Sequence, residues 1–185
     1  MMWRSHAMIG AGSVWLMALL PHGVAISADA SNPGLLAAVA ALGALLPDLD
    51  AAESKIKYLS PGWRIAPFAL PALLLHRAFG HRGLLHSACG LALFGVLVAL
   101  PLSARWGWQP SVALSLGYAS HLAADACTRT GIPFFYPNRR RVFLLPLPLR
   151  LVTGSAAEEA LLPLLALPVL LLLLDSLRQL SGASR

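Results

Sequence analysis

The sequence predicts an all-α protein: a polytopic transmembrane helical bundle with about five spans plus an interfacial or re-entrant segment. Of its 185 residues, 57% are hydrophobic and only 12% are charged, whereas soluble domains carry about 25% charged residues. The apolar residues gather in long runs, and the basic residues lie between these runs. Helices are the expected spanning elements because they satisfy their backbone polar groups internally. The length predicts one membrane-embedded domain over residues 1–185.

Five apolar runs are the candidate spans. A spanning helix needs about 20 residues, with a range of about 17–25. By this measure the first and third runs qualify, the fifth is close and the second is short. The fourth is interrupted near its end by His121 and Asp125. The runs cover residues 7–26, 34–47, 84–102, 110–126 and 159–175.

Two other stretches have a different character. The apolar stretch 61–76 is broken by Pro67 and Pro71, which favours an interfacial or re-entrant piece. The stretch 131–150 is rich in Pro, aromatic and Arg residues and predicts an irregular loop at the membrane interface. The first apolar run could also belong to a signal peptide cleaved near residues 28–30, and this alternative stays open.

The basic residues predict the orientation in the membrane. Five spans place the N-terminus and loops 48–83 and 126–158 on one side, which then holds 11 of the 14 Lys and Arg residues. The positive-inside rule assigns that side to the cytoplasm. Membrane orientation therefore explains the net charge of +6, and no nucleic-acid partner is expected.

Several chemistries lack their sequence signals. Cys89 and Cys127 have no CxxC spacing, so we expect small packing residues rather than a disulfide or a thiolate zinc site. The chain has no HExxH, no Gly-rich phosphate loop and no GxSxG, so a zincin protease and a serine hydrolase elbow are not indicated.

The polar residues that remain point to a metal. Seven of them lie near the predicted cytoplasmic ends of four runs: His6, Asp48, Asp50, His81, His86, His121 and Asp125. Polar residues at helix ends are ordinary, but His121 and Asp125 lie inside an apolar run, where an ionisable group costs about 2.5–3.5 kcal/mol. Their i, i+4 spacing puts both on one helix face, which suits ligands of one metal or of two adjacent metals. Imidazole and carboxylate ligands suit zinc, manganese or iron.

These residues divide into candidate roles. The predicted metal ligands are His6, Asp50, His81, His86, His121 and Asp125. Asp48 and Asp50 are the catalytic candidates, one as general base and the other as a ligand. The choice between them stays open, as does the choice between His81 and His86.

Three arginines are the candidate phosphate-binding residues: Arg82, Arg139 and Arg140. Membrane topology explains the run 139–141 about as well. Farther along, Ser155 and Glu158 have the spacing of a capping box before the last helix.

Four motifs together resemble the YdjM-like family of LexA-regulated inner-membrane proteins, which are described as metal-dependent hydrolases. The motifs are SHAMIGAGS, LLPDLD, RAFGHRGLLHS and GYASHLAADACTRTGIPFFYP, and the resemblance covers roughly residues 4–150. That family is in turn similar to zinc-dependent phospholipase C and related single-strand nucleases, whose ligands follow the order His, Asp, His, His-x-x-x-Asp. The candidate ligands here repeat that order. Trp3 is not N-terminal, unlike the Trp whose amine is a ligand in those enzymes, and no His follows His121. The resemblance therefore implies one or two ions rather than three.

The resemblance and the cluster together imply a function. We expect a membrane-bound hydrolase with a divalent metal, zinc first, acting on a phosphoester in a lipid-like substrate. The expected location is the bacterial inner membrane, multi-pass, with the active site facing the cytoplasm and membrane lipids as partners. An amide-lipid hydrolase is the close variant. A metal transporter or sensor, and a membrane protein with a structural metal, are the alternatives from other classes.

Overall fold

The computed structural model describes residues 1–19, 32–50 and 83–182, without the side chains of residues 18, 19, 49, 50 and 182. Every regular element within these ranges is a helix, and two isolated bridges, Thr128 with Leu151 and Ile132 with Val142, are the only β pairing there. The all-α prediction is therefore confirmed for the described residues. Segment 61–76, with its predicted interfacial or re-entrant piece, lies outside them.

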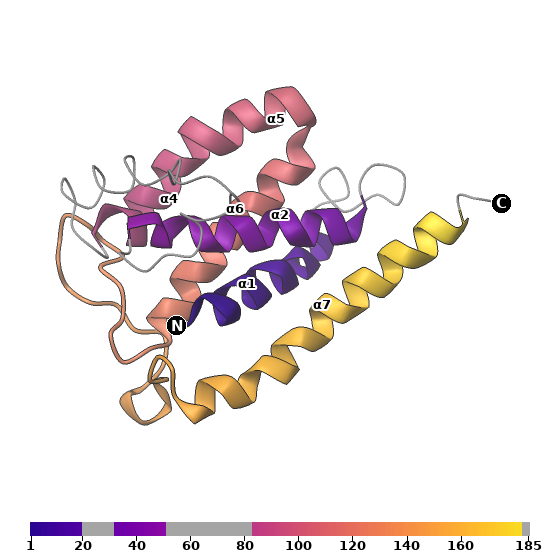
Figure 1. Ribbon diagram of the computed structural model, residues 1–185. Coiled ribbons are helices and arrows are strands. Elements are labelled where there is room, and N and C mark those ends of the chain that lie inside the picture. Colours follow the sequence, from indigo (N-terminus) through magenta and orange to yellow (C-terminus); the bar gives the residue numbers. More distant parts are fainter. Residues whose placement is uncertain (20–31, 51–82, 183–185) are drawn as a thin grey trace, which may run out of the picture.

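The helices follow one another along the chain as drawn in Figure 1. The first two pairs are α1 (Trp3–Gly12) with the 3-10 helix η1 (Ser13–Leu19), and α2 (Pro33–Leu45) with the 3-10 helix η2 (Leu46–Asp50). After the short turn η4 (Leu84–His86) come α4 (Ala88–Phe94), the π-helical η5 (Gly95–Ala99), α5 (Leu100–Trp106) and α6 (Trp108–Ala126). The short η6 (Leu147–Leu149) lies in the loop before the last helix, α7 (Ala156–Gly182).

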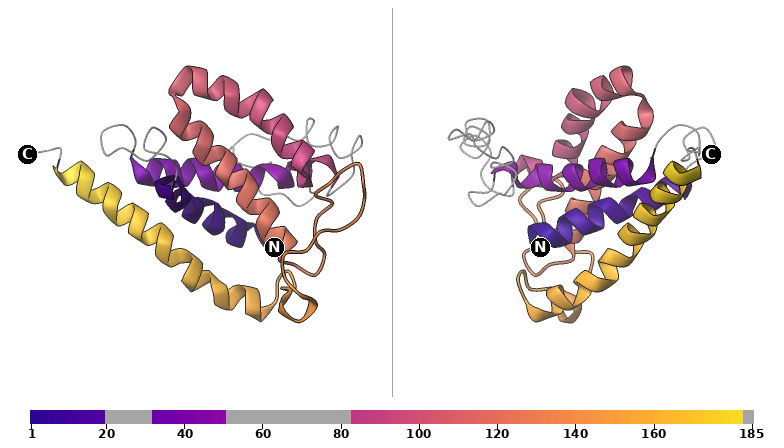
Figure 2. Two further views of the ribbon diagram at one scale, coloured as in Figure 1. Left: turned by 180° about the vertical axis from the view of Figure 1, so that it is seen from behind. Right: turned by 45° about the vertical axis from the view of Figure 1, so that its right-hand side comes forward.

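The centre of the molecule is a bundle of α1, α2 and α6, which the two views in Figure 2 show side by side. Its closest backbone approaches are made at glycines. A Cβ atom at Gly117 of α6 would overlap the carbonyl oxygen of Ala40, and one at Gly43 of α2 would overlap that of Leu114. Backbones can approach this closely only where the side chain is missing, which is how helices associate inside membranes.

Helices α4, η5 and α5 form one continuous stretch that turns back into α6. Gly107 makes the turn with a φ of 86°, a left-handed conformation that glycine adopts at no steric cost. The π-helical residues Gly95–Ala99 interrupt the regular winding in the middle of this stretch. The stretch and α6 therefore form a hairpin whose two open ends lie together.

Helix α7 runs alongside α1 and η1 and extends beyond the bundle (Figure 1). Trp15 Nε1 donates to the Pro168 carbonyl at 3.0 Å, and Gly34 N donates to Ser176 Oγ at 2.5 Å. Only half of the predicted capping box is present. Ser155 Oγ accepts from Glu158 N at 3.3 Å, but the Glu158 carboxylate accepts from other backbone amides instead of from Ser155.

Two described helices are long and apolar enough to cross a membrane: Ala88–Trp106, with 19 residues, and Ala156–Ser181, with 26. The predicted five spans are not supported. Helix α2 has 13 residues, which rise about 20 Å against a hydrocarbon core of about 30 Å. Helix α1 carries Arg4, Ser5 and His6 in its first turn, and α6 carries buried polar residues along its length.

Candidate metal centre

Five ionisable side chains from four elements converge at one end of the bundle. His6 lies near the start of α1, Asp48 in η2, His86 in η4, and His121 and Asp125 in the last turns of α6. Figure 1 shows the N-terminus beside the end of α6. The convergence follows from the topology. Helix α2 ends at this end of the bundle, and α1 and the α4–α6 hairpin begin there.

The ligand atoms lie at metal-binding distances from one another. His86 Nε2 and His121 Nε2 are 3.2 Å apart, and Asp48 Oδ1 lies 3.4 Å from the first and 3.8 Å from the second. Asp125 Oδ2 lies 3.9 Å from both imidazoles, and its Oδ1 lies 3.2 Å from His6 Nε2. Two trios keep all their ligand atoms within 4.8 Å, namely His6, Asp48 and His121, and His86, His121 and Asp125.

His121 belongs to both trios, and its orientation is fixed. Its Nδ1 lies 2.7 Å from the Ala44 carbonyl oxygen. A carbonyl can only accept, so Nδ1 carries the proton, and in the neutral ring Nε2 presents its lone pair to the cluster. Ala44 is in the last turn of α2, where carbonyls have no partner within the helix. The His6 ring stacks on the other side, with centroids 3.8 Å apart and planes at 18°.

His86 is held by the start of α4 and by α6. Ser87 is the N-cap of α4, and its Oγ accepts from Gly90 N at 3.1 Å. The Tyr118 hydroxyl of α6 donates to the Leu85 carbonyl at 2.6 Å. These two contacts flank His86 in sequence and fix the turn that carries it.

The cluster is buried, with one side accessible. The three imidazoles and Asp125 are at most 1% exposed, whereas the Asp48 side chain is 25% exposed. Burial raises the pKa of the Asp48 carboxyl, but the hydrogen bond with His86 and the nearby imidazoles outweigh it and hold that pKa well below its usual range. The Met1 amino group donates to Asp125 Oδ1 at 2.6 Å. A buried carboxylate such as that of Asp125 requires positive charge or hydrogen-bond donors nearby, and the Met1 amino group is one such donor.

Comparison with known proteins identifies the family. The family model described as "YdjM inner membrane protein" matches residues 1–180 of the chain. The chain belongs to the YdjM family. All five residues of the cluster lie inside the matched range.

Individual relatives are similar to the chain over part of their length. The inner membrane protein YdjM of Escherichia coli (strain K12) is 41% identical over 112 residues, which are 58% of this chain and 52% of the relative. The YdjM protein of Shigella flexneri gives the same figures. The match thus spans about half the length of these relatives. The uncharacterized protein YvsG of Bacillus subtilis (strain 168) is 33% identical over 131 residues, covering 71% of this chain and 73% of that protein. No solved structure matches the chain.

The structure brings together five of the residues that the YdjM-like motifs single out: His6, Asp48, His86, His121 and Asp125. Their role as metal ligands stays a prediction. Asp50 lies in η2, but its side chain is not described. His81 and Arg82 lie outside the described residues, so the structure places His86, and says nothing of His81.

The other two predicted phosphate-binding residues lie in the loop between α6 and α7. Arg139 and Arg140 are exposed there, and the Arg140 backbone amide donates to Asn138 Oδ1 at 3.0 Å. No contact found among the described residues joins either guanidinium to the cluster. Their role in binding substrate therefore remains a prediction.

Two groups at the site were not anticipated from the sequence. They are the Ala44 carbonyl, which orients His121, and the Met1 amino group on Asp125. A backbone carbonyl leaves no signal in a motif, although the end of a helix just before LPDLD points to unpaired carbonyls there. The amino group's contact depends on how α1 packs, and no residue pattern carries that information.

Proposed function

We propose that this YdjM-family protein is a metal-dependent hydrolase that cleaves a phosphoester in a lipid-like substrate at the cytoplasmic face of the bacterial inner membrane. The observation that supports it best is the pair of imidazole Nε2 atoms of His86 and His121, 3.2 Å apart and flanked by two carboxylates. The Nδ1 of His121 donates to a backbone carbonyl, as metal-binding histidines commonly do.

The donor set fits a divalent cation. Two nitrogen ligands of a tetrahedral zinc, at bond lengths of about 2.0–2.1 Å, lie about 3.3 Å apart, which matches the observed 3.2 Å. Imidazole nitrogens and carboxylate oxygens without thiolates are also the donors of catalytic zinc sites. His86, His121 and Asp125 would hold the ion, with Asp48 or His6 as a further ligand. Because both trios share His121, one ion is favoured over two.

The chemistry divides between the metal and the chain. A bound divalent cation supplies a Lewis acid that lowers the pKa of water and polarises a phosphoryl oxygen. The carboxylate of Asp48 is within 3.8 Å of both Nε2 atoms, a position that suits a ligand. Asp50 is then the carboxylate left to accept a proton as general base. Arg82, Arg139 and Arg140 remain the candidates for holding the phosphate.

The hairpin of the α4–α5 stretch and α6 supports a multi-pass arrangement. His86 precedes α4 and Asp125 ends α6, yet both lie in one cluster. If Ala88–Trp106 crosses the membrane, α6 has to return through it. The excess of basic residues on the cluster side, 11 of 14 in the sequence, supports a cytoplasmic position. Membrane-impermeant labelling of an Asn138→Cys variant, compared with the parent chain, tests this: added labelling from the periplasm would overturn the orientation.

A non-catalytic metal site is the second candidate. Four of the five side chains are at most 1% exposed, and structural zinc sites are closed in this way. Hydrolysis of an amide bond in a lipid is the close variant of the proposed reaction. The partly exposed Asp48 favours hydrolysis over a closed site, since it leaves one side of the cluster accessible.

Metal analysis combined with a hydrolysis assay tests the proposal. Purified protein is expected to retain zinc and to hydrolyse bis(p-nitrophenyl) phosphate or phospholipid in phosphatidylethanolamine–phosphatidylglycerol vesicles. His121→Ala and Asp125→Asn should lose both properties, whereas Asp175→Asn, at an exposed Asp on α7, should keep both. A metal-loaded wild type without turnover on either substrate or on an amide-lipid panel would favour the structural site. Full activity in His121→Ala would contradict the mechanism.

A further inference from the structure

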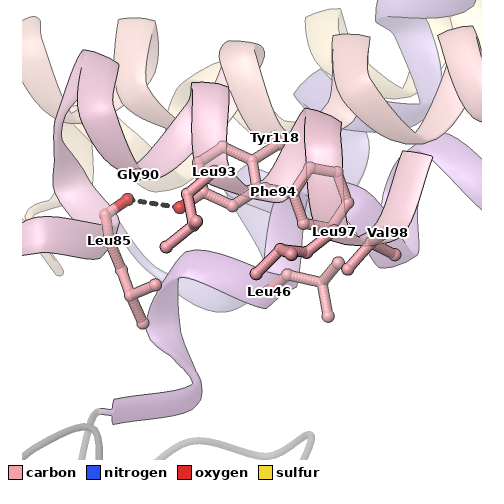
Figure 3. Close-up of a pocket in the computed structure, with 8 residues that line it drawn as sticks. All are labelled: Leu46, Leu85, Gly90, Leu93, Phe94, Leu97, Val98 and Tyr118. Carbon is pink, nitrogen blue, oxygen red and sulfur yellow. Dashed lines mark hydrogen bonds between the residues drawn. The ribbon is translucent and has the colours of Figure 1, made fainter. Parts of the chain in front are cut away.

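An apolar groove of about 310 Å³ lies next to the cluster (Figure 3). Its walls come from several elements. Leu85 of η4 lies beside the Tyr118 hydroxyl of α6 at one end, and Leu46 of η2 lies near Leu97 and Val98 toward the other, with α4 and η5 supplying the remaining wall. Phe94 stacks on Tyr118 with ring centroids 4.8 Å apart. The Tyr118 hydroxyl is occupied by the Leu85 carbonyl, so even this polar atom is not offered to an occupant.

The inner end of the groove adjoins the metal-ligand candidates. Leu85 immediately precedes His86, and it accepts a hydrogen bond from Tyr118 at this end. Tyr118 and His121 are at i and i+3, so they share a helix face, about 4.5 Å apart along the axis. A molecule lying along the groove therefore has one end beside the cluster.

The outer end of the groove lies on a candidate membrane-spanning helix. Leu97 and Val98 line it and are 63% and 42% exposed. Both belong to Ala88–Trp106, one of the two helices apolar enough to span. The surroundings of such a helix are lipid hydrocarbon. The volume has room for about ten groups the size of a water molecule, at about 30 Å³ each, which suits one chain and not a whole lipid.

A second apolar groove, of about 410 Å³, is a weaker candidate for the same role. Its wall on α6 consists of Ala119, Leu122, Ala123 and Ala126. At 3.6 residues per turn, the middle of this row is turned well away from the face that carries Tyr118, His121 and Asp125. A molecule bound in the second groove would therefore not lie along the helix face that leads to the cluster.

We propose that the first groove, the acyl groove, binds one hydrocarbon chain of a membrane lipid and thereby places the lipid's hydrolysable polar group at the His–Asp cluster. The inference rests on the proposed function and names its substrate class: a lipid that enters sideways from the bilayer. The apolar groove would bind the hydrocarbon chain, and the adjacent polar cluster would act on the head group.

Photocrosslinking tests the groove directly. The full chain is reconstituted in phosphatidylethanolamine–phosphatidylglycerol vesicles that contain phosphatidylethanolamine with a diazirine in one acyl chain. After illumination, mass spectrometry locates the labelled residues. Labelling is expected at Leu93, Leu97 and Val98, above the level on the exposed leucines of α7.

Two variants that fill the groove sharpen the test. Val98→Trp and Leu97→Trp should lower labelling of the remaining groove residues several-fold, because the indole occupies the space of the chain. The matched control is Val96→Trp, since Val96 is on the same turn, 61% exposed, and does not line the groove. Zinc retention and thermal unfolding equal to those of the control establish that the variants fold.

The outcomes separate the groove from the chemistry. Uniform labelling of all exposed apolar residues, unchanged by Val98→Trp, would overturn the acyl groove. A groove that carries no label, because other parts of the protein fill it, would also overturn the proposal. His121→Ala should keep the labelling pattern while losing metal. A wild type that binds no metal but labels as expected would overturn the proposed function while leaving the lipid-binding groove intact.

Discussion

The inner bundle and the outer helices are both apolar, yet they use different side chains. In the bundle of α1, α2 and α6, the closest helix contacts are made at Gly and Ala, and Ala40 and Ala113 are fully buried beside larger core residues such as Leu36. On α7 and the α4–α5 stretch, large side chains point outward, and Leu97 and Leu164 are 63% and 67% exposed. Lipid is as apolar as leucine, so small residues mark helix-to-helix contacts and large aliphatic residues mark lipid contacts.

The same difference places the chemistry. Close backbone approach in the bundle brings the ends of three helices together, and the ionisable side chains lie there, shielded on most sides. The outer helices contribute a membrane-facing wall and, through η4, one ligand candidate, His86. Variants that separate these contributions should therefore have different consequences for activity and for stability.

The largest expected effect concerns the carboxylates of η2. Asp50→Ala should lower turnover by about 10²–10⁴-fold, as for a lost general base, with zinc retained. Asp48→Ala should instead lower the zinc content. The hydrolysis assay and metal analysis on the same preparations measure both. A reversed pattern would exchange the two roles, and no effect of either variant would remove both from the site.

The next largest effect is expected for two leucines on α7, one facing the bundle and one facing away from it. Leu172 is 2% exposed and belongs to the bundle core, whereas Leu170 is 51% exposed. Leu172→Ala should destabilise the protein by about 2–5 kcal/mol, the usual cost of a core truncation. Leu170→Ala should change stability by less than about 0.5 kcal/mol. Denaturant unfolding in detergent measures the difference, and equal effects would mean that α7 does not dock on the bundle as described.

A glycine pair tests the close approach. Gly117→Ala should destabilise the bundle by about 1–3 kcal/mol, the usual cost of overpacking, because its Cβ would overlap the Ala40 carbonyl. Gly95→Ala, where a Cβ meets open space, should be neutral or stabilising, since alanine favours a helix over glycine by about 0.5–1 kcal/mol. Thermal unfolding of both variants gives the comparison. Destabilisation by Gly95→Ala alone would contradict the packing.

The smallest expected effect lies where α7 meets the N-terminus. Glu158 is buried and accepts from Met2 N at 2.6 Å and Gly154 N at 2.8 Å. Glu158→Gln should cost about 1–2 kcal/mol, because one charge-assisted hydrogen bond is lost. Its neighbour Glu159 is 56% exposed and meets Arg4 at 3.4 Å, so Glu159→Gln should cost at most about 1 kcal/mol. Unfolding curves that rank the two variants in the opposite order would argue against a stabilising contact between Glu158 and the Met2 amide.

Much of the candidate site could be predicted from sequence because its residues break a strong pattern. His121 and Asp125 interrupt an apolar run at i, i+4, and the remaining polar residues lie at the ends of other runs. Placing the ends of these runs on one side of the membrane predicted that the polar side chains lie close together. The contacts that orient the residues could not be predicted, because the Ala44 carbonyl and the Met1 amino group reach the cluster only through helix packing.

The five-span prediction is not supported among the described residues, for a related reason. Hydropathy scores the Ala and Gly residues of α2 as membrane-like, but they pack against α1 and α6 instead of lipid. The capping box failed in part because Glu158 has other amides to accept from. Local patterns identify helices and polar residues, whereas the choice between partners is made by tertiary contacts.

The central claim is that His86 and His121 hold the same metal ion, and X-ray absorption at the zinc edge tests it most directly. The wild type should show a nitrogen and oxygen shell at about 2.0–2.1 Å with the scattering pattern of imidazole. His86→Ala and His121→Ala should each weaken that pattern or lose the zinc, while Asp175→Asn leaves it unchanged. A sulfur shell at about 2.3 Å, or an imidazole signal that survives both histidine variants at full zinc content, would contradict the claim.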